Sequence, residues 1–164
     1  MRRTLVAGFG NVLRGDDGFG VEVIREMERA GTAPPGTVLL EVGTGGIALA
    51  QALLMPYDRL IVIDAMLCEG APGSLHVLRV EAVEALREVD MHMAVPARAL
   101  GLAKVLGVLP AEVFLIGCAP VDVEELMMDL SPPVREAVGE AVRAVASLLG
   151  SDPLPVAAGA STHG

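Results

Sequence analysis

Residues 59–64 read Arg-Leu-Ile-Val-Ile-Asp, an apolar run between two charged residues. A short run of this kind, rich in β-branched side chains, is typical of a strand that is buried on both faces. Similar runs at 4–9 (Thr-Leu-Val-Ala-Gly-Phe) and 112–117 (Glu-Val-Phe-Leu-Ile-Gly) predict two more strands of the same type. Because parallel sheets covered by helices produce this pattern, the three runs indicate an α/β protein.

Segments with helical spacing separate these strands. The expected helices are the segment that contains Val21, Ile24 and Met27, residues 47–55, residues 97–106, and residues 132–150. The last one has a serine at its N-cap position, Ser131, a proline at its first position, Pro132, and a glycine at its end, Gly150. Serine caps and first-turn prolines are common helix start signals, so this boundary is well defined.

Two further strands complete the predicted sheet. Residues 37–41 form a second apolar run, and residues 74–80 alternate imperfectly, as expected of an edge strand. The alternation of strands and helices predicts one three-layer α/β domain over residues 1–150, with a mainly parallel, five-stranded twisted sheet and helices on both faces. Residues 151–164, rich in Pro, Ala, Gly and Ser, are expected to form a flexible tail.

Composition excludes several function classes. The chain has 164 residues, a formal net charge of -9 and only 2% aromatic residues, which argues against nucleic-acid and anionic-membrane partners. No uncharged stretch reaches the length of about 20 residues that a membrane span needs. We therefore expect a soluble cytoplasmic protein without membrane insertion, acting as a monomer. Cys68 and Cys118 are expected to be buried free thiols in a reducing compartment.

In parallel α/β sheets, ligands bind beyond the carboxyl ends of the strands. The first such end carries Gly8-Phe9-Gly10, the beginning of a dinucleotide-binding pattern. That pattern requires a third small residue where this chain has Leu13, and it places a pyrophosphate where this chain has Asp16 and Asp17. A nucleotide- or flavin-binding module is therefore the weaker reading of this loop.

A divalent metal site fits the acidic residues better. Asp16 and Asp17 follow the first strand, Asp64 ends the third, and His92 precedes the helix that starts near Pro96. Two carboxylates and one imidazole with open positions suit zinc, nickel or iron. Taken singly, each residue also has an ordinary structural reading, such as a helix cap, a turn or a solvated loop. Their joint placement favours the metal site, whereas His76 and His163 are expected to be solvated.

The chain as a whole resembles the hydrogenase maturation proteases, the endopeptidases that finish the large subunit of nickel–iron hydrogenases. The resemblance extends over about residues 2–149 and depends on the order and spacing of several motifs. These are Gly8-Phe9-Gly10-Asn11 with residues 15–21 (Gly-Asp-Asp-Gly-Phe-Gly-Val), residues 41–46 (Glu-Val-Gly-Thr-Gly-Gly), residues 61–65 (Ile-Val-Ile-Asp-Ala), Met91-His92-Met93, and residues 117–120 (Gly-Cys-Ala-Pro) with the acidic stretch and helix start that follow.

The resemblance implies both a reaction and a site. The reaction is hydrolysis of one peptide bond near the C-terminus of the large-subunit precursor, after nickel has been inserted. Asp17, Asp64 and His92 match the family's metal ligands, and nickel presented by the substrate is the implied metal, with zinc or cadmium able to occupy the same site. The implied substrate-binding residues are Glu41, Gly43, Thr44 and Gly45.

The mechanism stays open at this point. A metal-polarised carbonyl or a metal-bound water is favoured, with Asp16 or Asp17 handling protons. Cys118 is the alternative nucleophile, although a thiol at the end of a buried strand is usually inert. A non-catalytic, metal-sensing chaperone of the precursor is the alternative function.

Overall fold

The computed structural model describes residues 2–31, 33–83, 94–123 and 125–150. Along the chain, its elements are β1 (Thr4–Phe9), the 3-10 turn η1 (Gly15–Gly18), α1 (Phe19–Ala30), β2 (Thr37–Gly43), α2 (Ile47–Ala52), β3 (Arg59–Ala65), β4 (Leu75–Arg79), α4 (Ala94–Val105), β5 (Glu112–Cys118) and α5 (Pro132–Gly150). The tail predicted at 151–164 and the predicted ligand His92 lie outside the described residues.

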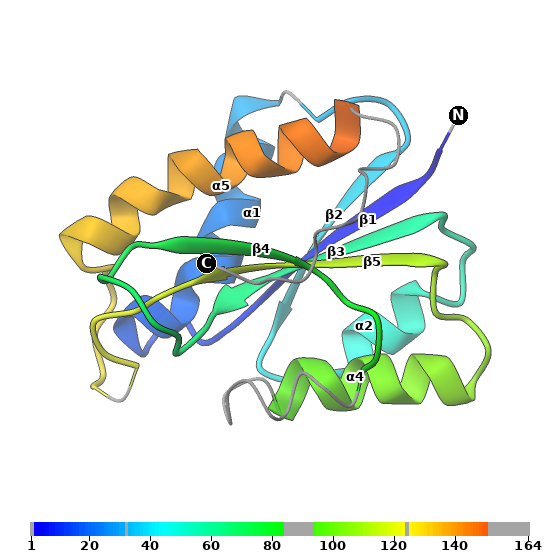
Figure 1. Ribbon diagram of the computed structural model, residues 1–164, viewed down its shortest axis with the longest axis horizontal. Coiled ribbons are helices and arrows are strands. Elements are labelled where there is room, and N and C mark those ends of the chain that lie inside the picture. Colours follow the sequence, from blue (N-terminus) through cyan, green and yellow to red (C-terminus); the bar gives the residue numbers. More distant parts are fainter. Residues whose placement is uncertain (1, 32, 84–93, 124, 151–164) are drawn as a thin grey trace.

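The strands form one sheet in the order β2-β1-β3-β5-β4. The first four run parallel to one another, and β4 pairs antiparallel with β5 at the edge. Figure 1 shows α1 and α5 on one side of this sheet and α2 and α4 on the other. The three-layer, mainly parallel α/β fold expected from the sequence is thus confirmed, including the edge position of β4.

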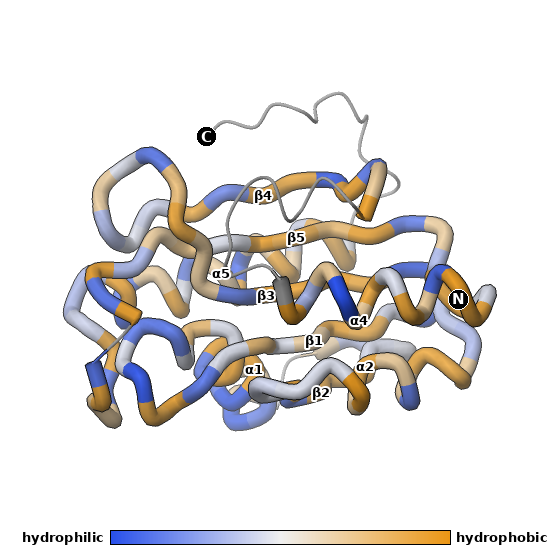
Figure 2. Tube along the Cα trace, turned by 90° about the horizontal axis from the view of Figure 1, so that it is seen from below, coloured by the Kyte–Doolittle hydropathy of each residue, from blue (hydrophilic) through white to orange (hydrophobic). Residues whose placement is uncertain are grey.

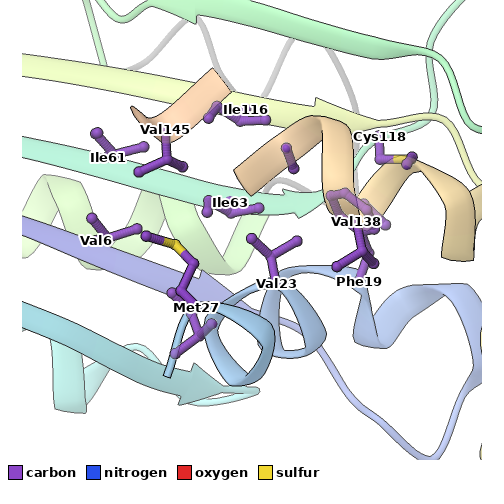
Figure 3. Packing of buried hydrophobic residues seen from close by; sticks show 14 of the residues in the cluster. Val6, Phe19, Val23, Met27, Ile61, Ile63, Ile116, Cys118, Val138 and Val145 are labelled. Atoms are coloured by element: carbon purple, nitrogen blue, oxygen red, sulfur yellow. The ribbon is translucent and has the colours of Figure 1, made fainter. Parts of the chain in front are cut away.

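Alternate residues of the central strands build a separate core on each face. Ile61 and Ile63 of β3 face α1 and α5, and Figure 3 shows Ile61 beside Val145 and Ile63 beside Val23. Leu60 and its neighbours on the opposite face pack toward α2 and α4. Figure 2 shows hydrophobic colours along β3 and β5. Burying each such side chain contributes about 1.5–3 kcal/mol, so the sheet centre anchors the fold.

Several predicted boundaries differ from the structure. The helix predicted over 97–106 begins at Ala94, so Pro96 lies inside its first turn, where a missing N–H costs nothing. The helix predicted over 47–55 ends at Ala52, and the strand predicted to end at Glu41 continues to Gly43. None of the helices within the described ranges is long and apolar enough to cross a membrane.

Candidate functional site

Close backbone packing brings η1 against the carboxyl edge of the sheet. A Cβ atom on Gly8 would lie 2.2 Å from the carbonyl oxygen of Gly20, and one on Gly20 would lie 2.1 Å from the carbonyl oxygen of Ile63. Only glycine fits at either position, so α1 starts in contact with both β1 and β3. A Cβ on Gly10, whose φ is 128°, would lie 1.8 Å from the carbonyl oxygen of Asp17. Close backbone packing therefore accounts for these glycines without a bound pyrophosphate.

Asp16 connects η1 to the segment that follows β5. Its side chain is buried, with 2% of the residue exposed. One carboxylate oxygen accepts the Val121 N–H at 2.8 Å and the Ser131 hydroxyl at 2.8 Å, and the other accepts the Ser131 N–H at 2.7 Å. Ser131 also begins α5, because its carbonyl accepts the Arg135 N–H. Asp16 therefore holds two distant segments together, a role that the sequence alone did not indicate.

Asp17 and Asp64 lie at the same edge of the sheet. Asp17 is half-buried, and its carboxylate accepts the Asn11 N–H at 3.0 Å. Asp64 is 5% exposed, and its carboxylate accepts the Ala65 N–H at 2.8 Å. By the alternation along β3, Asp64 shares its face with Leu60 and so points to the side covered by α2 and α4. The structure thus brings the two predicted carboxylate ligands to one edge of the sheet.

The third predicted ligand precedes α4. His92 lies outside the described residues, but α4 begins two positions later, with Val95 and Arg98 beside Thr44 at the same carboxyl edge. Within the described ranges no group of three His, Cys, Asp or Glu side chains is placed to hold a metal ion. The described donors are therefore the two carboxylates, whose oxygens suit a divalent ion such as nickel or zinc.

The loop after β2 forms the other side of the site. Thr44 lies between two hollows, one of about 390 Å³ shared with α4 and one of about 290 Å³ shared with the loop that contains Asn11. Gly43 takes a φ of 72°, and its carbonyl accepts the Gly10 N–H at 2.8 Å, which ties the loop to β1. Gly45 also lines the larger hollow, so the predicted substrate loop has room on both sides for a polypeptide.

Glu41 has a different role from its three neighbours in the motif. Its carboxylate pairs with the Arg25 guanidinium of α1, at 3.2 Å and 3.3 Å. Hydrogen bonding to Glu41 raises the pKa of Arg25 above its ordinary value, with a smaller contribution from Glu22. The pair is largely exposed and so adds little stability. It directs the Glu41 carboxylate toward α1 at the margin of the smaller hollow.

The two cysteines and His76 differ in part from the expectation. Cys118 is fully buried, but Cys68 is only half-buried. Burial, followed by the negative charge of Asp16, raises the pKa of Cys118 to about 12, so its thiolate is scarce at neutral pH. This disfavours Cys118 as a nucleophile. His76 is not solvated as predicted, because its Nε2 atom is buried without a hydrogen-bond partner among the described residues.

Comparison with known proteins identifies the family. The family model for hydrogenase maturation proteases matches residues 21–148. The chain is 35% identical to the hydrogenase expression/formation protein HupD of Bradyrhizobium diazoefficiens, over 85% of this chain and 74% of that one. It is 31% identical to the hydrogenase 2 maturation protease of Escherichia coli, over 90% of both chains.

The chain belongs to the hydrogenase maturation protease family. Solved structures agree with this assignment. The hydrogenase maturating endopeptidase HybD from E. coli has a TM-score of 0.78 and 30% identity, covering 90% of this chain and 91% of that one. The [NiFe] hydrogenase maturation protease HybD from Thermococcus kodakarensis has a TM-score of 0.77 and 28% identity, covering 89% and 98%. The protein is accordingly an endopeptidase of the hydrolase class, and the alternative of a nucleotide-binding module has no support.

Proposed function

We propose that this maturation protease removes the C-terminal extension from the nickel-loaded large-subunit precursor of a nickel–iron hydrogenase. The single observation that carries the proposal is the placement of both Asp17 and Asp64 at the carboxyl edge of the sheet. Carboxylates at a ligand-binding edge favour a cation, and the cation proposed here is nickel that the substrate brings. We further propose that the enzyme works in the cytoplasm as a monomer.

The proposed metal is nickel held by the precursor, so the enzyme needs no metal of its own. Asp17 and Asp64 supply oxygen donors, and His92 is proposed as the third ligand. A partly coordinated nickel ion with open positions accepts such donors, which allows the enzyme to distinguish loaded from empty precursor. Zinc or cadmium is expected to bind the same donors in the isolated protein, because both accept carboxylate and imidazole ligands.

The proposed chemistry assigns different roles to the two neighbouring aspartates. A divalent ion near the scissile bond polarises its carbonyl and acidifies a bound water. Asp17, half-buried at the edge of the site, is the candidate that would accept the water's proton, through the carboxylate oxygen that does not hold the ion. Asp16 holds Val121 and Ser131 and so is proposed to keep η1 in place rather than to move protons. The substrate chain is proposed to lie along Thr44 and its adjoining glycines.

The test is a cleavage assay that separates a protease from a chaperone. Purified protein is mixed with nickel-loaded or nickel-free precursor, and the mass of the large subunit is followed by intact-protein mass spectrometry. The proposal expects loss of the C-terminal fragment from the loaded precursor alone. Equal cleavage of both forms would contradict nickel recognition, and binding without any change in mass would support the chaperone alternative.

A further inference from the structure

An exposed apolar surface lies next to the candidate site. Five side chains from two segments form it, and we call it the apolar edge surface: Leu13, Val121, Leu126, Met127 and Met128. Leu126 is 76% exposed and Met128 is 72% exposed. Exposed apolar side chains that cluster in this way commonly mark a protein–protein contact.

Backbone pairing joins the two segments that carry this surface. The Met127 N–H donates to the carbonyl of Leu13 at 2.9 Å, and the Gly15 N–H donates to the carbonyl of Met127 at 2.8 Å. The two segments thus form a short parallel bridge directly before η1. In Figure 1 the yellow segment after β5 lies beside the blue turn that precedes α1, at the left end of the sheet. The apolar edge surface therefore adjoins the turn that holds Asp17.

The same segment is strongly acidic. Residues 121–130 contain no basic residue, and the acidic residues that the structure describes among them are Asp122, Glu125 and Asp129. The only ion pair that the described residues show for Asp129 joins it to Arg135 at 3.7 Å, and both side chains are more than half exposed. An apolar surface with an acidic border is complementary to a partner whose apolar face has a basic border. Methionine side chains adapt to the contours of such a partner at little cost.

We propose that the apolar edge surface docks the folded body of the large-subunit precursor, through an apolar face bordered by Lys or Arg, while the candidate site receives the precursor's C-terminal segment. This rests on the proposed function and adds the surface by which the partner is held. Asp16 connects the two activities structurally, because it accepts hydrogen bonds from Val121 and Ser131 on either side of the docking segment. Docking thereby fixes the distance between the precursor's body and η1.

The test compares matched double variants at opposite ends of the molecule. Leu126→Ser with Met128→Ser removes the most exposed side chains of the surface. The control, Val105→Ser with Leu106→Ser, makes the same change at the far end of α4, where Val105 is 84% exposed and Leu106 is 52% exposed. Binding of nickel-loaded precursor is measured by biolayer interferometry, and cleavage by intact-protein mass spectrometry.

We expect the Leu126→Ser/Met128→Ser variant to raise the Kd for precursor about tenfold or more and to raise KM with kcat unchanged. The control variant is expected to stay within about twofold of wild type. If the wild type cleaves the precursor and the Leu126→Ser/Met128→Ser variant has unchanged Kd and KM, the docking surface is refuted. The proposed function is not affected by that result. A tenfold loss of binding by this variant supports the docking surface, whether or not the wild type cleaves the precursor. If the wild type leaves the precursor uncut, that result contradicts only the proposed function.

Discussion

The buried carboxylates at the two ends of the sheet have different hydrogen-bond partners. At the amino end, Glu112 of β5 lies beside its pairing partner Arg59 of β3, with Arg2 and Arg79 also within ion-pair distance. At the carboxyl end, the buried Asp16 accepts hydrogen bonds from two backbone N–H groups and one hydroxyl among the described residues. At the same end, the Asn11 N–H donates to the Asp17 carboxylate, and the Ala65 N–H donates to the Asp64 carboxylate.

This difference distinguishes the ion-pair cluster at the amino end from the acidic cluster of the candidate site. A carboxylate neutralised by arginine has its partner within the fold and attracts no further cation. Asp16, Asp17 and Asp64 place three acidic side chains at the other edge, and acidic side chains gathered in this way create a local potential that favours a cation. Part of the net charge of -9 is thus concentrated where the substrate's metal is proposed to enter.

The largest expected effect concerns catalysis. Asp64→Asn removes the charge of a proposed nickel ligand while preserving its size, so we expect processing of nickel-loaded precursor to fall about a thousandfold or more. The assay is the mass shift of the large subunit. The matched control is Asp58→Asn directly before the opposite end of the same strand, where Asp58 is exposed and accepts the Arg3 N–H. Normal processing by Asp64→Asn would refute its assignment.

The second effect concerns stability at the amino end. Arg59→Met leaves Glu112 with fewer positive partners in a buried setting, so we expect the free energy of unfolding to fall by about 3–5 kcal/mol. Adding Glu112→Leu to the same chain removes the charge of Glu112 and is expected to recover most of the lost free energy of unfolding. Urea denaturation measures both. If the single variant is as stable as wild type, the ion pair is not the structural element we describe.

The third effect tests Asp16 as a positioning residue. Asp16→Ala leaves the N–H groups of Val121 and Ser131 without their acceptors, and we expect a loss of about 2–4 kcal/mol in unfolding free energy. Asp16→Asn retains an acceptor oxygen and is expected to lose less. Residual cleavage by folded Asp16→Asn distinguishes positioning from proton transfer. Complete inactivity with wild-type stability would instead make Asp16 the catalytic carboxylate.

The smallest effect is expected at Cys118. With a pKa of about 12, roughly one Cys118 thiol in ten thousand is ionised at pH 8, so Cys118→Ser should process precursor at the wild-type rate. Iodoacetamide at pH 8 should label the half-buried Cys68 first. Because folding raises this pKa, the stability it confers is present below about pH 9 and declines as the pH rises toward 12. Inactivity of a folded Cys118→Ser variant would restore the thiol mechanism.

Much of this molecule could be predicted from local patterns. The run at 59–64 predicted β3 because burial on both faces demands continuous apolar residues, and the Ser131–Pro132 pair located the start of α5. The contact of Asp16 with Val121 and Ser131 could not be predicted, since more than 100 residues separate the partners and no periodicity encodes such contacts. The prediction that His76 is solvated was wrong for a related reason, because burial at a sheet edge depends on the loops that cover it.

The central claim is that Asp17 and Asp64 coordinate the nickel ion that is bound to the precursor. Nickel K-edge X-ray absorption of the loaded precursor, alone and freeze-quenched with wild-type enzyme or with Asp64→Asn, tests it most directly. We expect the wild type to add oxygen or nitrogen scatterers at about 2.0–2.1 Å from nickel and Asp64→Asn to add fewer. Identical nickel spectra for the precursor alone and with wild-type enzyme would contradict the account.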